Sequence, residues 1–281
     1  MGAAPIILGG LPRSGSTLLS ALLRQNRFVD VTPTGFMLGL VQGIVNQYTA
    51  SDPRKSWLDQ DDAVARMHDA VAGAVSGYLN RGAIPIEKSR GALPLFTLLE
   101  RAIGEPPRII VPVRDLRGCV ASMEKLHRAN PELAGFGAPH VGQRVDKWLA
   151  NDAPPLGAML QQLADAHHTG ILDRCLVVRY EDLTAAPIAE LERIYRFLGY
   201  ELPDCHDASN VEDVRREHDA VHGPFGDHAV HSGPVHPAPE DWDHYLGEPI
   251  ARAIVERNAW FYRRLYPERI SGSQPQAEQA L

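Results

Sequence analysis

Residues 9–18 read GGLPRSGSTL, and this stretch lies between an apolar run, PIILG at 5–9, and a helical pattern that begins at residue 16. A strand, a tight turn and a helix in this order form the context in which backbone amides and a helix N-terminus bind an anion. Gly10 and Gly15 permit the tight backbone geometry that such a turn needs. The stretch therefore predicts an anion-binding loop at the carboxyl end of the first strand.

The spacing of this loop fits the Walker A phosphate loop, GxxxxG followed by Lys and Ser or Thr, at every position except one. Ser16 stands where the lysine is expected, and Thr17 follows it. Ser14, Ser16 and Thr17 offer hydroxyl donors, and the guanidinium of Arg13 can hold phosphate oxygens in a fork. We therefore expect an anion site that works without the Walker lysine.

Short apolar runs alternate with helical patterns along most of the chain. Three of the four runs are typical of strands that helices cover on both faces, because Ile, Val or Leu is nearly continuous in them. Strands are predicted at 5–9, 83–87, 108–113 and 174–179, and helices at about 16–25, 36–48, 57–80, 92–103, 117–127, 140–150, 155–168, 187–198 and 248–265. This alternation predicts an α/β protein with three α/β/α layers and a central parallel sheet.

Length and composition limit the remaining possibilities. The chain has 281 residues, of which 44% are hydrophobic, and a formal net charge of −7. We expect one domain over residues 1–270 with a flexible tail at 271–281. The negative charge argues against nucleic-acid binding. No apolar run reaches the length of a membrane span, no signal peptide is expected ahead of the first strand, and three scattered cysteines predict no disulfide framework. These features favour a cytoplasmic protein.

The segment PRSGST with the following LLSALL resembles the 5′-phosphosulfate loop of sulfotransferases that use 3′-phosphoadenylyl sulfate (PAPS). These enzymes share their core with P-loop nucleoside triphosphatases and kinases. Three further segments resemble the family, and they are IEKSRGALP (86–94), VPVRDLRGCVASM (111–123) and VVRYEDLTAAPIAELERIYRFLGY (177–200). The resemblance thus covers residues 5–200.

The resemblance implies a role for each matching residue. Arg13, Ser14, Gly15, Ser16 and Thr17 would bind the 5′-phosphosulfate. Arg114 and Ser122 would hold the 3′-phosphate, Tyr180 would lie by the adenine, and Lys88 would stabilise the bridging oxygen during transfer. The expected reaction moves a sulfuryl group to an acceptor hydroxyl, or as a weaker alternative an amine, and releases adenosine 3′,5′-bisphosphate (PAP). Because a sulfuryl group carries less charge than a phosphoryl group, we expect no metal requirement.

The general base departs from the family pattern. Arg90 occupies the position where cytosolic small-molecule sulfotransferases have a histidine, and residues 28–40 offer only Asp30 where protein-tyrosine and heparan-type enzymes have a glutamate. The candidates that remain are His222, His228, His140 and Glu87. Glu87 adjoins Lys88, so on a continuing strand the two side chains should face opposite ways.

Two segments are predicted to complete the site. Residues 34–82 lie where the family has acceptor-binding helices, for a small-molecule or peptide acceptor, and Met37, Leu38, Val41 and Tyr48 there could line a pocket or simply pack in the core. Residues 206–240 predict a lid-like loop, in which Ser232 and Gly233 are the candidates for closing over the 3′-phosphate. Six histidines between 218 and 244 have irregular spacing, so no metal site is predicted.

Two other function classes stay open. A kinase-like phosphotransferase would share the loop, but Ser16 in place of lysine argues against it. A non-catalytic PAPS-binding module would explain the absent family base. The sequence leaves the acceptor and the oligomeric state open.

Overall fold

A computed structural model describes residues 4–51, 58–80, 83–130, 138–151, 153–212, 232–238 and 240–270. Within these residues the strands form one parallel sheet in the order β2-β3-β1-β4-β5. The strands are β1 (Ile6–Leu8), β2 (Val29–Val31), β3 (Ile84–Lys88), β4 (Arg108–Val113) and β5 (Leu176–Arg179). The predicted α/β class with a parallel sheet is confirmed.

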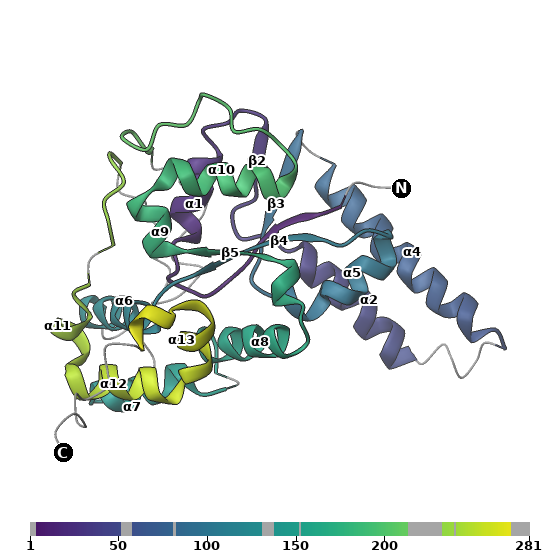
Figure 1. The fold of residues 1–281 in the computed structure, drawn as a ribbon. Coiled ribbons are helices and arrows are strands. Elements are labelled where there is room, and N and C mark those ends of the chain that lie inside the picture. Colours follow the sequence, from purple (N-terminus) through teal and green to yellow (C-terminus); the bar gives the residue numbers. More distant parts are fainter. Residues whose placement is uncertain are drawn as a thin grey trace, which may run out of the picture.

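Helices cover both faces of this sheet (Figure 1). α1, α9 and α10 lie on one side of the strands, α2, α4, α5 and α8 lie on the other, and α11–α13 gather beside α6 and α7. The helices are α1 (Ser16–Leu23), α2 (Met37–Ser51), α4 (Gln60–Leu79), α5 (Phe96–Ile103), α6 (Leu116–Ala129), α7 (Val141–Leu149), α8 (Gly157–His168), α9 (Tyr180–Ala185), α10 (Pro187–Leu198), α11 (Trp242–Leu246), α12 (Glu248–Arg257) and α13 (Ala259–Leu265). This arrangement of helices on both faces of one sheet is a three-layer α/β/α fold.

Alternating residues of the central strands pack into two separate hydrophobic cores, one on each face of the sheet. In β1, Ile7 packs into the core shared with α2, α4, α5 and α6, whereas Ile6 and Leu8 pack against α1 and α10. In β4, Ile109 and Ile110 divide between the two cores in the same way. Because both faces of each strand are covered, the carboxyl ends of the strands are where loops are free to build a site.

The structure differs from the sequence prediction at several elements, among them the short helix α11, which was not predicted. β2 was not predicted, because it is a three-residue edge strand with Asp30 in its middle. α9 begins directly at Tyr180, whereas no element was predicted between the strand that ends at 179 and the helix that begins at 187. The predicted helix 248–265 is divided at Asn258, whose side-chain amide donates to the carbonyl of Ile254 at 2.8 Å and whose own carbonyl accepts from the amide of Phe261. In the described parts of the chain, no helix has the length and apolar character needed to cross a membrane.

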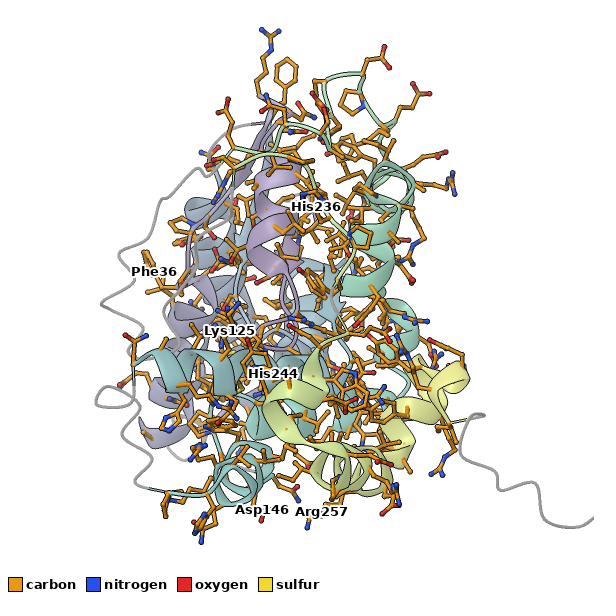
Figure 2. The ribbon with its side chains drawn as sticks, turned by 90° about the vertical axis from the view of Figure 1, so that its left-hand side faces the viewer. Phe36, Lys125, Asp146, His236, His244 and Arg257 are labelled. Carbon is orange, nitrogen blue, oxygen red and sulfur yellow. The ribbon has the colours of Figure 1, made fainter. Side chains whose placement is uncertain are left out.

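Charged contacts hold the α6, α7 and α12 region together. The guanidinium of Arg144 makes a fork with the carboxylate of Glu124, at 2.7 and 2.9 Å, and Arg128 adds a third bond at 2.9 Å. Glu124 is fully buried. At the surface, Arg257 of α12 lies 2.5 Å from Asp146 of α7, and Figure 2 shows the two residues together. The buried pair is the one that should matter for stability.

Replacing Glu124 with glutamine should lower the free energy of unfolding at pH 7 by about 3 kcal/mol, since it leaves the buried Arg144 without its charge partner. Burial opposes ionisation of Glu124, but the bonds and charges of Arg144 and Arg128 outweigh it and hold its pKa below the ordinary 4.5. A carboxyl with a lowered pKa stabilises the fold above the unfolded-state pKa and loses this effect as the pH falls. The difference between parent and variant should therefore be constant near pH 7 and shrink below about pH 4.5 in urea titrations.

The matched control is Glu192→Gln, which breaks an exposed pair with Arg196 on α10. We expect it to cost less than about 0.5 kcal/mol at either pH. Equal effects of the two substitutions would contradict the importance of the buried pair.

Candidate active site at the carboxyl ends of the strands

The loop between β1 and α1 is fixed to the neighbouring strand β4. The amides of Gly9 and Leu11 donate to the carbonyls of Ile110 and Pro112 at 2.9 and 3.0 Å. Gly10 lies so close to Pro112 that a Cβ there would be 2.1 Å from the Pro112 carbonyl oxygen. The loop is thus held against β4 by its backbone.

Two residues of the loop take the left-handed conformation, Arg13 with φ 60° and Gly15 with φ 84°. Such a backbone turns successive amides toward one side, which makes a nest for an anion. Positive φ is uncommon outside glycine and concentrates at functional sites. The hydroxyl of Ser14 is buried and donates to the Leu11 carbonyl at 2.5 Å, so it braces the loop. Ser14 could therefore serve an anion through its backbone amide rather than through the hydroxyl that the sequence suggested.

The residues predicted for the 3′-phosphate lie directly beside the loop. The Arg13 side chain donates from Nε to Ser122 Oγ of α6 at 3.0 Å, and Arg114 donates to the Arg13 carbonyl at 3.4 Å. Gly118, in the first turn of α6, leaves room for Arg114, since a Cβ there would be 2.7 Å from Arg114 Nε. Segments more than 100 residues apart thus meet at one corner.

Tyr180 completes this corner from the end of β5. The guanidinium carbon of Arg114 lies 4.6 Å from the centre of the Tyr180 ring. The ring also lies against Gly15, where a Cβ would be 2.3 Å from the ring carbon Cδ2. Arg13, Gly15, Arg114, Ser122 and Tyr180 therefore form one cluster of cationic, hydroxyl and aromatic groups.

Lys88 reaches the same loop from β3. It is the last residue of that strand, in register with Leu8 of β1, and its Nζ donates to Thr17 Oγ1 at 3.5 Å. Its backbone amide donates to Thr32 Oγ1 at 2.8 Å. The ammonium group thus lies at the first turn of α1, beside Ser16, which opens the helix.

Glu87 faces the opposite side of β3, as the alternation of side chains predicts. Its carboxylate is fully buried and accepts from the Met37 amide at 2.9 Å and from the Thr32 hydroxyl at 3.1 Å. Burial raises its pKa, although hydrogen bonds from Met37, Thr32 and Tyr78 oppose the rise. Its geometry is that of an anchor for the β2–α2 connection, and we assign it this role in place of a general base.

Of the other candidates for the general base, only His140 lies within the described residues. His140 is exposed at the N-cap of α7. His222 and His228 lie outside the described residues, and with His218 and His231 they make up four of the six histidines between 218 and 244. In the described ranges, no group of three or more His, Cys, Asp or Glu side chains is arranged to hold a metal ion.

The described end of the predicted lid runs beside α9. Gly233 exchanges two backbone bonds of 2.9 Å with Val211, and Ala238 donates to the Thr184 hydroxyl of α9 at 3.0 Å. Ser232 is exposed. The segment therefore lies against the helix that Tyr180 begins.

A cavity of about 400 Å³ lies at the edge of the sheet, next to Thr32. It is lined by Asp30, Thr32, Phe36, Gly77, Tyr78, Leu79 and Pro85. Phe36 is 63% exposed and points outward (Figure 2), and its ring meets Tyr78 edge to face at 4.8 Å. Met37, Leu38 and Val41 were candidates for lining a pocket, but in the structure they pack in the core.

Comparisons with known proteins agree on one family. The model described as "Sulfotransferase family" matches residues 5–204. Protein-tyrosine sulfotransferase 1 of Danio rerio is 27% identical over 205 residues, or 69% of this chain and 52% of that protein. Protein-tyrosine sulfotransferase 2 of Gallus gallus is 26% identical over 204 residues, or 71% of this chain and 52% of that protein. The chain thus spans about half the length of these curated relatives.

A solved structure shows the same fold at lower sequence identity. The structure of a mouse sulfotransferase, SULT7A1, complexed with PAP is similar with a TM-score of 0.56 at 15% identity, and the match covers 95% of this chain and 86% of that one.

Proposed function

Because the chain belongs to the sulfotransferase family, we propose that it transfers a sulfuryl group from PAPS to an acceptor hydroxyl and releases PAP. We further propose that residues 1–270 form one catalytic domain. The observation that carries the proposal is the convergence of Arg13, Lys88, Arg114, Ser122 and Tyr180 on one loop. These residues come from the ends of four different strands and the helix that follows one of them.

The donor chemistry fits this cluster. PAPS carries anionic groups at two ends, a 5′-phosphosulfate and a 3′-phosphate, and therefore needs two sets of donors. The amides and hydroxyls of residues 13–17 with Lys88 would hold the first. Arg114 and Ser122 would hold the second, and the Tyr180 ring offers a flat apolar surface to the adenine.

The proposed reaction is an in-line displacement at sulfur. The acceptor oxygen forms a bond to sulfur as the bond between sulfur and the 5′-phosphate oxygen breaks, and the hydroxyl proton passes to a base. Lys88 and the loop donors stabilise the charge that develops on the leaving phosphate. This arrangement replaces the Walker lysine and its metal, since Ser16 stands at the lysine position. His222 and His228 are our candidates for the base, because the pKa of imidazole lies near neutrality.

The acceptor would enter from the side of residues 34–82. The names of the curated relatives support a phenolic hydroxyl as the first to test. The cavity of about 400 Å³ beside Thr32 has the size of a small-ligand site and an aromatic edge. Small phenols and tyrosine-containing peptides are therefore the acceptors of choice for an assay.

Calorimetric titration tests the donor. We expect PAP to bind with a dissociation constant in the micromolar range or below, unchanged by a metal chelator, and ATP with Mg²⁺ to bind far more weakly. Equal preference for ATP with Mg²⁺ would favour a kinase-like phosphotransferase. Incubation with PAPS and the acceptor panel then separates an enzyme from a binding module, since PAPS that is bound but never consumed would favour the module.

A further inference from the structure

Two buried tyrosines at the C-terminal end of the described chain point toward the donor corner. Tyr262 lies in α13 and Tyr266 directly follows it, so that the two are one helical turn apart. Both side chains are fully buried. The hydroxyl of Tyr262 donates to Asp115 Oδ1 at 2.9 Å, and that of Tyr266 donates to Glu181 Oε2 at 2.8 Å. Each tyrosine thus holds one carboxylate.

These carboxylates belong to the residues that follow Arg114 and Tyr180 in sequence. Asp115 caps α6 by accepting from the Arg117 amide at 2.9 Å. Its own amide donates to Glu181 Oε1 at 3.1 Å, which ties the β4 corner to the β5 corner. Arg114 and Tyr180, stacked at 4.6 Å, directly precede Asp115 and Glu181 in the chain. The hydrogen bond between Asp115 and Glu181 therefore helps to set the position of the neighbouring Arg114–Tyr180 pair.

Two arginines lie near the carboxylate of Asp115 and balance its charge. Arg117 lies 2.5 Å from Asp115, and Arg269 lies 3.9 Å from the same carboxylate. Burial and the neighbouring carboxylates raise the pKa of both tyrosines, so their hydroxyls remain protonated donors. Asp115 is buried and Glu181 is half-buried. A carboxylate in such a place that loses a donor must find another partner or shift, because an unsatisfied buried acceptor is costly.

We propose that Tyr262 and Tyr266 are positioning residues of the nucleotide site: through Asp115 and Glu181 they set the stacked Arg114–Tyr180 pair that receives the 3′-phosphate and the adenine. The inference rests on the proposed function for the identity of the nucleotide. It gives the C-terminal helices, which lie outside the matched family segment 5–204, a part in donor binding.

The first test removes only the hydroxyl groups. Tyr262→Phe should weaken PAP binding about fivefold by calorimetry, the size expected for one hydrogen bond. The loss should be much smaller for adenosine 5′-monophosphate, which has no 3′-phosphate for Arg114 to hold. Tyr266→Phe acts on Tyr180 and should weaken both nucleotides. The matched control is Tyr195→Phe, a buried tyrosine whose hydroxyl contacts Asn26 and His206, and it should leave both affinities unchanged.

A double-mutant cycle separates positioning from general stability. If Tyr262 acts through Arg114, then Tyr262→Phe should cost less than about twofold in PAP affinity when Arg114 is already alanine. A full fivefold loss in that background, or unchanged affinity of Tyr262→Phe with a lowered melting temperature, would overturn the inference. If the parent chain binds no PAP, the proposed donor is wrong, and crystal structures of parent and Tyr262→Phe decide instead. A guanidinium of Arg114 that does not move between them would overturn the positioning role.

Discussion

Replacing Lys88 with alanine should reduce sulfuryl transfer by roughly a hundredfold to a thousandfold, the usual cost of removing one preorganised donor of transition-state charge. Lys88 Nζ lies 3.5 Å from Thr17 Oγ1, at the first turn of the helix that would face the phosphosulfate. Charge grows on the bridging oxygen only as the bond to sulfur breaks. PAP affinity should therefore fall far less than turnover, and transfer of labelled sulfate from PAPS to a phenolic acceptor measures the difference.

Two further variants serve as a control and as a partial rescue for the Lys88→Ala result. Lys147→Ala removes an exposed lysine from α7 and should change neither turnover nor binding. Lys88→Arg keeps the charge but not the compact ammonium, and should recover only part of the activity. Turnover preserved in Lys88→Ala would remove Lys88 from the mechanism. Turnover and PAP affinity lost in equal measure would make it a binding residue instead.

The sequence predicted those parts of the fold that depend on local pattern. β1, β4 and β5 consist mainly of Ile, Leu and Val, and β3 begins with Ile-Pro-Ile before its charged end. A mainly apolar run between helices is a strong signal for a buried parallel strand. β2 carries no such signal, because VDV is short and its pairing with β3 is a tertiary effect. The break at Asn258 likewise falls inside an otherwise helical sequence pattern, and one side-chain hydrogen bond accompanies it.

The same distinction holds for the candidate site. Arg13, Lys88, Arg114 and Tyr180 stand at strand ends or in the loop, where position along the chain predicts proximity, and the structure brings them together. The sequence could not show which side chains form hydrogen bonds within the fold and so have a structural role. The Ser14 hydroxyl takes its role from the turn of the loop. The Glu87 carboxylate, Tyr262 and Tyr266 take theirs from partners distant in sequence.

Replacing Arg114 with alanine should weaken PAP binding more than tenfold, which corresponds to at least about 1.4 kcal/mol. Arg114 is the cation that stacks on Tyr180 and donates to the Arg13 carbonyl. Its removal would take a charge-assisted contact from the 3′-phosphate and leave the aromatic ring without this cation. Arg13→Ala should weaken binding by a similar factor, because Arg13 belongs to the loop that would hold the 5′-phosphosulfate and its side chain also bonds Ser122.

Nucleotides that differ by one phosphate tell the two arginines apart. Arg114→Ala should discriminate little between PAP and adenosine 5′-monophosphate, because the group that Arg114 holds is the one that the monophosphate lacks. Arg13→Ala should weaken both nucleotides, and Arg196→Ala, an exposed arginine on α10, should weaken neither. If Arg114→Ala retained the full preference for PAP, the 3′-phosphate would have to be held elsewhere, and the corner of β4 and α6 would lose its proposed role.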